Sequence, residues 1–130
     1  MYSDTNLSNT TIEGTSDNDH IENEGNYITI NGNDGDDTLF GGADDDQFWF
    51  GKGNGSDIIN DCDDDDLVVL YDISLSDIMS FAHEGNQISA SFSDGSRLTV
   101  NTSGDESHYR LGDGSKWEYN HNSRVFEYDD

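Results

Sequence analysis

The sequence contains no proline, one cysteine, and five lysine and arginine residues among its 130 residues. The absence of proline suits a chain whose turns use their backbone N–H groups as hydrogen-bond donors, because proline has no such group. The single cysteine, Cys62, excludes an internal disulfide. Its acidic neighbours disfavour the reactive thiolate, so we assign it no chemical role.

Long apolar runs and known catalytic signatures are also absent. No apolar run approaches the roughly 20 residues of a membrane-spanning helix, and the polar start YSDTNLSNT predicts no cleaved secretory signal. Neither G-x-S-x-G nor H-E-x-x-H occurs. The four histidines lack the spacing of a zinc site: His20, His83, His108 and His121. We expect no enzymatic activity here; the catalytic domain of any parent enzyme or toxin would lie outside this chain.

Acidic residues dominate what is present. The chain has 29 Asp and Glu residues and a net charge of −24, with 31% hydrophobic residues. Two carboxylates about 4 Å apart repel by roughly 4 kcal/mol at an effective dielectric of about 20, whereas burying a Leu or Ile returns only about 1.5–3 kcal/mol. A compact fold therefore requires counter-charge, and Ca²⁺ with an all-oxygen shell is the simplest source. The same charge repels nucleic acid.

Large apolar residues recur every nine positions, at Ile21, Ile30, Leu39 and Phe48. A period of nine fits neither a helical face nor an alternating strand. It predicts a very short strand followed by a sharp turn, repeated along the chain. The intervening Gly, Asn and Asp residues are the types that tolerate such turns.

This pattern resembles the RTX (repeats-in-toxin, haemolysin-type calcium-binding) family, whose nonapeptide is G-G-x-G-x-D-x-U-x, with U a large apolar residue. Residues 41–49 match with Asp in place of the third glycine, and residues 32–40 match with Asn33 as the second residue. Residues 14–22 match more loosely. Residues 23–31 have Ile28 where the carboxylate belongs.

The spacing changes after Phe48, because the next apolar residue, Ile59, comes eleven positions later. The turn from Gly51 to Asp57 therefore holds two extra residues. Residues 61–69 form a sixth, decayed repeat, with Asp66 and Val68 in the two key positions.

The resemblance implies an all-β fold: a parallel β-roll (a β-helix or solenoid) followed by an antiparallel β capping region. In such a roll, eighteen residues make one coil, and alternate turns lie on opposite sides. One side carries Asp19, Asp37 and Asp57; the other carries Asp46 and Asp66, with Ile28 interrupting that row.

By the same resemblance, each Ca²⁺ lies between same-side turns of successive coils and takes backbone carbonyls and aspartate carboxylates as ligands. About three ions are implied. The first would use Thr15, Asp17 and Asp19 with Gly32, Asp34 and Asp37; the second Asn33, Gly35 and Asp37 with Lys52, Asn54 and Asp57; the third Gly42, Asp44 and Asp46 with Asp61, Asp63 and Asp66.

We divide the chain into a linker (residues 1–11), the roll (12–69) and the capping region (70–130). In the capping region, alternating patterns predict strands and residues 72–78 predict one helical turn capped by Ser74. The expected strands are 67–70, 79–83, 87–93, 97–100, 108–111, 116–119 and 124–128. The junction with the roll is expected to contain Trp49, Phe50, Trp117 and Tyr119.

The implied function is a calcium-binding module that folds after type I secretion, as the C-terminal part of a larger exported bacterial protein. The last residues, 125–130, mix apolar and acidic types as export signals of this kind do. One alternative is calcium-dependent binding of a carbohydrate or a partner surface through Tyr27, Phe40 and Trp49. Another is an acidic DNA mimic. An EF-hand is excluded, because Asp66 stands where its loop needs glycine and no helices flank it.

Overall fold

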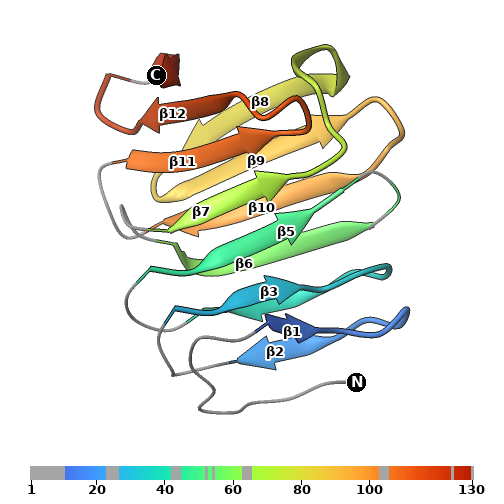
Figure 1. Ribbon diagram of the computed structural model, residues 1–130. Coiled ribbons are helices and arrows are strands. Elements are labelled where there is room, and N and C mark those ends of the chain that lie inside the picture. The colour runs from blue at the N-terminus through green and yellow to red at the C-terminus, as the bar shows by residue number, and fades with distance from the viewer. Residues whose placement is uncertain are drawn as a thin grey trace.

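The computed structural model describes residues 11–22, 27–41, 45–51, 53, 55–62, 66–102, 106–123 and 125–129. The fold is all-β, as predicted (Figure 1). The short strands of the first half are β1 (Thr11–Glu13), β2 (His20–Glu22), β3 (Thr29–Asn31), β4 (Thr38–Phe40), β5 (Gln47–Phe50), β6 (Ser56–Cys62) and β7 (Leu67–Leu70). The second half contains β8 (Ile78–Glu84), β9 (Gln87–Phe92), β10 (Arg97–Thr102), β11 (Glu106–Leu111), β12 (Lys116–Asn120) and β13 (Val125–Asp129).

The first seven strands alternate between two sheets. Strands β1, β3, β5 and β7 pair in parallel in one sheet, and β2, β4 and β6 pair in parallel in the other. Ile21 pairs with Leu39, eighteen residues later, as the nine-residue period predicts. Leu39 then pairs with Ile59, twenty residues later, so the turn between β5 and β6 absorbs the two extra residues. The predicted parallel β-roll is confirmed.

The second half extends both sheets of the roll. Strand β10 pairs in parallel with β6, and β11 pairs in parallel with β7. Antiparallel strands then complete each sheet, giving the orders β2-β4-β6-β10-β9-β8 and β1-β3-β5-β7-β11-β12-β13. The predicted strands are present, with ends that differ by up to two residues. The proposed boundary between residues 69 and 70 stays a prediction, and Thr11, assigned to the linker, already belongs to β1.

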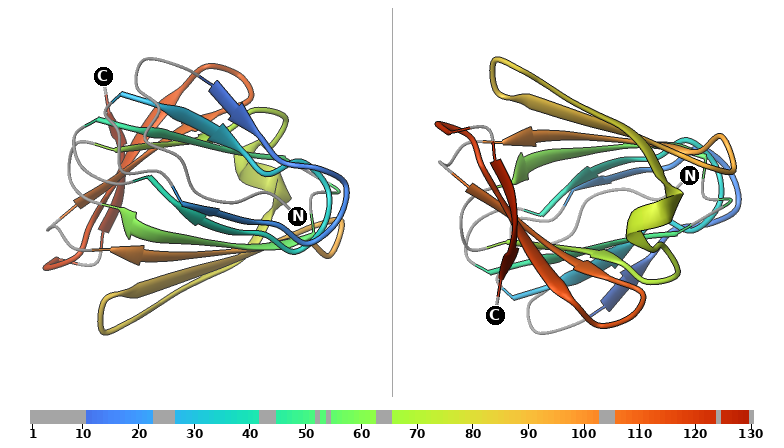
Figure 2. Two further views of the ribbon diagram at one scale, coloured as in Figure 1. Left: turned by 90° about the horizontal axis from the view of Figure 1, so that it is seen from below. Right: turned by 90° about the horizontal axis from the view of Figure 1, so that it is seen from above.

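The predicted helical turn is a 3₁₀ turn, η1 (Leu75–Asp77), with Ser74 at its N-cap. The Ser74 N–H donates to Asp77 Oδ2 at 3.0 Å. This turn carries the chain from β7 in one sheet to β8 in the other, and Figure 2 shows it at one side of the two sheets.

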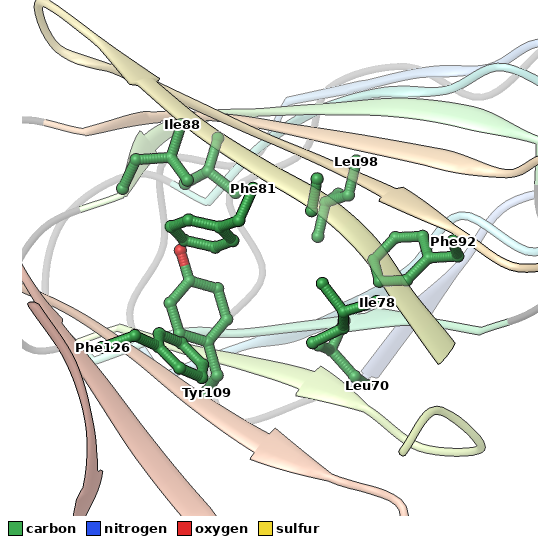
Figure 3. Close-up of a pocket in the computed structure, with 10 residues that line it drawn as sticks. Leu70, Ile78, Phe81, Ile88, Phe92, Leu98, Tyr109 and Phe126 are labelled. Atoms are coloured by element: carbon green, nitrogen blue, oxygen red, sulfur yellow. The ribbon is translucent and has the colours of Figure 1, made fainter. Parts of the chain in front are cut away.

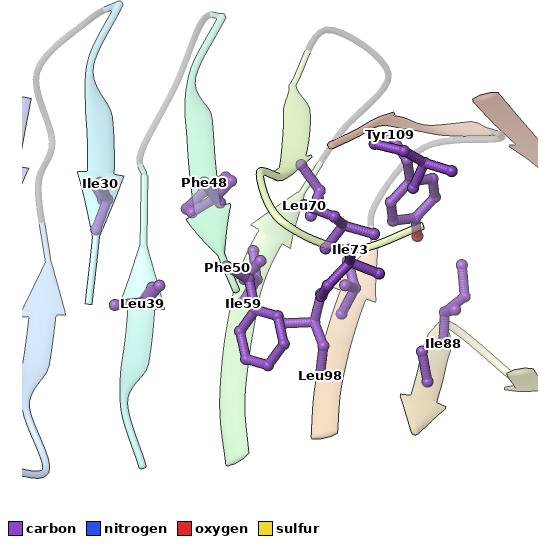
Figure 4. Packing of buried hydrophobic residues seen from close by; sticks show 14 of the residues in the cluster. Ile30, Leu39, Phe48, Phe50, Ile59, Leu70, Ile73, Ile88, Leu98 and Tyr109 are labelled. Carbon is purple, nitrogen blue, oxygen red and sulfur yellow. The ribbon is translucent and has the colours of Figure 1, made fainter. Parts of the chain in front are cut away.

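The core lies between the two sheets and follows the nine-residue period (Figure 4). Each three-residue strand buries its middle residue, because its neighbours point to the outer face. Phe50 joins the roll to the capping strands through a ring contact with Phe92, at 5.4 Å between centroids. Tyr119 is buried and Trp117 stacks on Phe126, whereas Trp49 packs beside Tyr71, which follows β7.

Candidate metal centres

Successive strands of the roll alternate between the two sheets, which Figure 2 shows end-on, so the connections between strands fall into two sets. We call the turns from β1 to β2, β3 to β4 and β5 to β6 the near side, and those from β2 to β3, β4 to β5 and β6 to β7 the far side. Each side carries a row of aspartates at, or just before, the start of its strands. The near-side row is Asp19, Asp37 and Asp57, and the far-side row is Asp46 and Asp66; all five are at most 3% exposed.

Hydrogen bonds link successive aspartates of each row. On the near side, the Asp19 N–H donates to Asp37 Oδ1 at 2.8 Å, and the Asp37 N–H donates to Asp57 Oδ1 at 3.0 Å. On the far side, the Asp46 N–H donates to Asp66 Oδ1 at 2.9 Å. Ile28 lacks a carboxylate but keeps its place in this row, since its N–H donates to Asp46 Oδ1 at 3.1 Å. One oxygen of each accepting carboxylate therefore binds the preceding coil.

The second carboxylate oxygen is available to a cation on the near side. Asp37 Oδ2 and Asp57 Oδ2 are both buried, and within the described part of the chain neither accepts a hydrogen bond. A buried, unsatisfied carboxylate oxygen costs free energy, and a hard cation would remove that cost. The residues present thus fit a calcium ion.

The electrostatics of the near-side row change along it. Burial, with a smaller contribution from neighbouring carboxylates including that of Asp36, raises the pKa of Asp37 to about 6 and that of Asp57 to about 8. Backbone hydrogen bonds to each carboxylate act in the opposite direction and only partly offset the rise. For Asp19, burial acts to raise the pKa, whereas hydrogen bonds from the Thr15 N–H and hydroxyl are among the interactions that lower it, and the net pKa is lowered. The two aspartates deeper in the row therefore favour either a proton or a cation.

Glycines shape the turns around these carboxylates. A Cβ on Gly14 would approach Asp19 Oδ2 to 2.6 Å, and a Cβ on Gly32 would overlap Asp37 Oδ2. Gly35 adopts φ of +95° and Asn33 adopts φ of 61°, so Asn33 takes the left-handed conformation of the glycine that it replaces. These turns therefore hold backbone carbonyls and carboxylates close together.

The near-side turns also stack directly on one another. The Asn33 side-chain amide donates to the Gly14 carbonyl at 2.9 Å, and the backbone of Gly35 packs against the carbonyl of Asp17. Outside the buried row, Asn18 Oδ1 accepts the Asp36 N–H at 2.8 Å, and Asp36 Oδ1 accepts the Ser56 N–H at 2.8 Å. The sequence analysis missed this second row, although Asn18 and Asp36 occupy the same position of their repeats.

The described structure brings together the candidate ligands of the near side. It contains Thr15, Asp17, Asp19, Gly32, Asn33, Asp34, Gly35 and Asp37 in the first two near-side turns, and Asp57 at the start of β6. On the far side, Asp46 and Asp66 stack, and Asp61 lies within β6 rather than in a turn. Five candidates lie outside the described residues: Gly42, Asp44, Lys52, Asn54 and Asp63.

Side chains alone do not complete a metal shell in the part of the chain that is described. No group of three or more His, Cys, Asp or Glu residues there is arranged to hold a metal ion. Calcium takes six to eight oxygens, so backbone carbonyls of the turns would have to supply the remainder. The glycine-rich turns provide these carbonyls.

Other candidate sites are weaker. The apolar cavity in Figure 3, between β8, β9, β10 and β11, has a free volume of about 20 Å³, which is too small for a ligand. The aromatic residues proposed for carbohydrate binding do not form one surface: Phe40 packs against His20 on one sheet, and Trp49 packs against Tyr71 from the other. Among the described residues, no helix is long and apolar enough to cross a membrane.

Comparison with known families agrees with this geometry. A family model described as the RTX calcium-binding nonapeptide repeat (4 copies) matches residues 29–57, from β3 into the start of β6. The matched segment includes Asp37, Asp46 and Asp57. No curated protein matches the chain. The family match, the nine-residue period and the stacked aspartate rows together identify residues 29–57 as RTX calcium-binding nonapeptide repeats.

Proposed function

We propose that the chain is a calcium-binding module that folds when Ca²⁺ binds its aspartate rows. The buried oxygens Asp37 Oδ2 and Asp57 Oδ2, for which the described structure offers no hydrogen-bond donor, are the observation that carries this proposal. Calcium would supply the positive charge that the rows lack. About three ions bind in the proposal: two on the near side, sharing Asp37, and one on the far side between the turns of Asp46 and Asp66.

The chain's own residues build these sites. The backbone bonds from Asp19 to Asp37 and from Asp37 to Asp57 set the spacing of the coils. Gly32 leaves room for the Asp37 carboxylate, and Gly35 exposes its carbonyl toward the next coil. Ordering one near-side turn therefore also positions the next, and the two near-side ions should bind cooperatively.

The energetics suit a fold that depends on its environment. Binding at about 100 times Kd stabilises a folded state by roughly 2.7 kcal/mol per site, and three sites would exceed about 5 kcal/mol, the lower end of domain stability. Extracellular calcium modules typically have Kd values of about 10⁻⁴–10⁻³ M. Low intracellular Ca²⁺ would thus leave the chain unfolded, and millimolar Ca²⁺ outside the cell would fold it.

We further propose that the module belongs to a larger exported bacterial protein and is secreted by a type I apparatus, which requires an unfolded chain. The support is the RTX repeat together with the net charge of −24, because repulsion between carboxylates keeps the metal-free chain expanded. Any enzymatic activity then belongs to another part of the parent protein, and the partners of this part are calcium and the secretion apparatus.

Circular dichroism of the full chain tests calcium-induced folding. In EDTA we expect a largely unfolded spectrum, and rising Ca²⁺ should convert it cooperatively to a β-sheet spectrum. Mg²⁺ at equal concentration is the control and should convert it much less, because its small octahedral shell fits stacked carbonyls poorly. A β-sheet spectrum in EDTA that Ca²⁺ leaves unchanged would refute the proposal and favour the acidic DNA mimic.

A further inference from the structure

Two hairpin turns of the second half share the sequence Asp-Gly-Ser. Asp94 Oδ1 accepts the Ser96 N–H at 3.0 Å and the Ser96 hydroxyl at 2.5 Å. Asp113 Oδ1 accepts the Ser115 N–H at 2.9 Å and the Ser115 hydroxyl at 2.6 Å. The two turns are therefore built by the same local hydrogen bonds.

The turns differ in what the second carboxylate oxygen does. Asp94 Oδ2 accepts the N–H of Gly53 at 2.6 Å, across 41 residues of sequence. Gly53 lies in the near-side turn that holds the two extra residues. For Asp113, the hydrogen bonds within the described structure come from its own turn. Among the described residues, therefore, Asp94 contacts a repeat turn and Asp113 does not.

A second bond holds the same repeat turn from the same side. The Arg97 N–H, at the start of β10, donates to the carbonyl of Gly55 at 3.1 Å. Gly53 and Gly55 adopt φ of 83° and 82°, conformations that glycine reaches with little strain. On its other side, Gly55 packs against the carbonyl of Gly35, where a Cβ would come within 2.7 Å of the oxygen. The Gly35 carbonyl is one of the proposed calcium ligands.

We propose that Asp94 is a positioning residue for the near-side calcium site between turns 32–37 and 51–57. Asp94 Oδ2 accepts the Gly53 N–H on one side of turn 51–57, and on the other side Gly35 of the preceding coil packs against Gly55. This inference rests on the proposed calcium-binding function and extends it to a residue outside the repeats.

The physical reason is the entropy of that turn. The two extra residues and three glycines of turn 51–57 add conformational entropy to the unfolded chain, so fixing this turn on calcium binding costs more free energy than fixing a nonapeptide turn. A carboxylate that already holds the Gly53 N–H removes part of that cost, as preorganisation does for any binding site. The coupling is reciprocal, so calcium at this site also stabilises the hairpin of β9 and β10.

The test compares Asp94→Asn with Asp113→Asn in the full chain. Each substitution keeps one carbonyl oxygen for the serine of its turn, removes one negative charge, and replaces the second oxygen with an NH₂ group that cannot accept a hydrogen bond. Calorimetric calcium titration should show Asp94→Asn weakening one site by roughly three- to tenfold, the usual range for one hydrogen bond. Asp113→Asn should stay within about twofold of wild type at every site.

Two further measurements separate the effect of this hydrogen bond from a charge effect. The loss in Asp94→Asn should persist at about 0.5 M salt, where the attraction of a distant charge is screened. Hydrogen exchange of the Gly53 amide in calcium-saturated protein should accelerate in Asp94→Asn and not in Asp113→Asn.

Equal losses in the two variants, unchanged affinity in Asp94→Asn, or a loss that disappears at high salt would overturn the role of Asp94. Wild-type protein that takes up no calcium would overturn the proposed function together with it. The two failures are therefore distinguishable.

Discussion

In Asp37 and Asp57, the two carboxylate oxygens have different roles. Oδ1 of Asp37 and of Asp57 accepts a backbone N–H from the preceding coil, and Oδ2 remains without a hydrogen bond in the described structure. The hydrogen bond through Oδ1 fixes the spacing between successive coils. The buried Oδ2, which accepts no hydrogen bond in the described structure, would be stabilised by a positive charge beside it. A single residue type thus contributes both to stacking and to metal binding.

Replacement of Asp37 should weaken more calcium sites than replacement of Asp57. Asp37 is shared by the two proposed near-side ions, whereas Asp57 ends the row and contributes to one. We therefore expect calorimetry to show two weakened ions in Asp37→Ala and one in Asp57→Ala. Equal losses in the two variants would contradict the stacking order of the proposed sites.

The metal-free chain should respond to pH in the direction set by the raised pKa values of Asp37 (about 6) and Asp57 (about 8). An aspartate whose folded pKa exceeds its ordinary 3.8 stabilises the fold below that ordinary value, and this contribution is lost as pH rises through the folded pKa. Asp19, whose pKa is lowered, behaves in the opposite way: its contribution to stability is present above its ordinary pKa and is lost as pH falls through the folded pKa.

Protein in EDTA should therefore be more compact at pH 5 than at pH 8.5, as measured by small-angle scattering and circular dichroism. Asp57→Asn, which cannot ionise, should reduce the difference between the two pH values. A metal-free chain that is equally expanded at both would show that these carboxylates do not limit folding.

At the scale of single strands, the middle residue carries the core. Leu39 is 1% exposed and lies between Ile21 of β2 and Ile59 of β6. Because Leu39 is buried within the continuous core, Leu39→Ala should cost about 2–5 kcal/mol of folding free energy and raise the Ca²⁺ concentration at the folding midpoint.

The outward-facing neighbour provides the control for that substitution. Thr38→Ala should change the folding free energy by less than about 1 kcal/mol, because the Thr38 side chain stands on the outer face of β4. Chemical unfolding at fixed calcium measures both. Equal destabilisation by the two variants would contradict a core built from middle residues.

Much of the roll could be predicted from the sequence because its contacts are periodic. The nine-residue spacing of Ile21, Ile30, Leu39 and Phe48 correctly predicted which residues are buried and which strands pair. The change in spacing from nine to eleven residues before Ile59 correctly predicted a turn with two extra residues. In each case a local pattern determines the neighbour one coil away.

The second half could be predicted only as separate strands. Its alternating patterns located β8 to β13, but nothing local indicates that β10 joins β6 in parallel and β11 joins β7. Pairing across some forty residues depends on the whole core rather than on a repeat. For the same reason, the hydrogen bond from the Gly53 N–H to Asp94 could not be predicted, because the local sequence Asp94-Gly95-Ser96 indicates a hairpin turn and nothing more.

At the scale of the whole molecule, the C-terminal strand bears on both folding and export. Strand β13 pairs along β12, and Phe126 stacks on Trp117 with ring centroids 5.2 Å apart. Deletion of residues 124–130 should abolish type I export if the signal lies there, and it should also lower stability by removing this strand.

A point substitution separates the two effects. Phe126→Ala should lower the stability of the calcium-loaded fold while leaving export intact, since the exported chain is unfolded. Secretion assays on intact cells measure export, and thermal unfolding of purified protein measures stability. Export that survives the deletion would place the signal elsewhere.

The alternation of odd and even strands between two sheets has a consequence for how such a chain can change length by duplication. Adding one nonapeptide would reverse the parity of every later strand and send β10 and β11 to the wrong partners. Adding two would leave that parity intact. The unit of viable gain or loss in this part of the gene is therefore eighteen codons, although the motif itself is nine residues long.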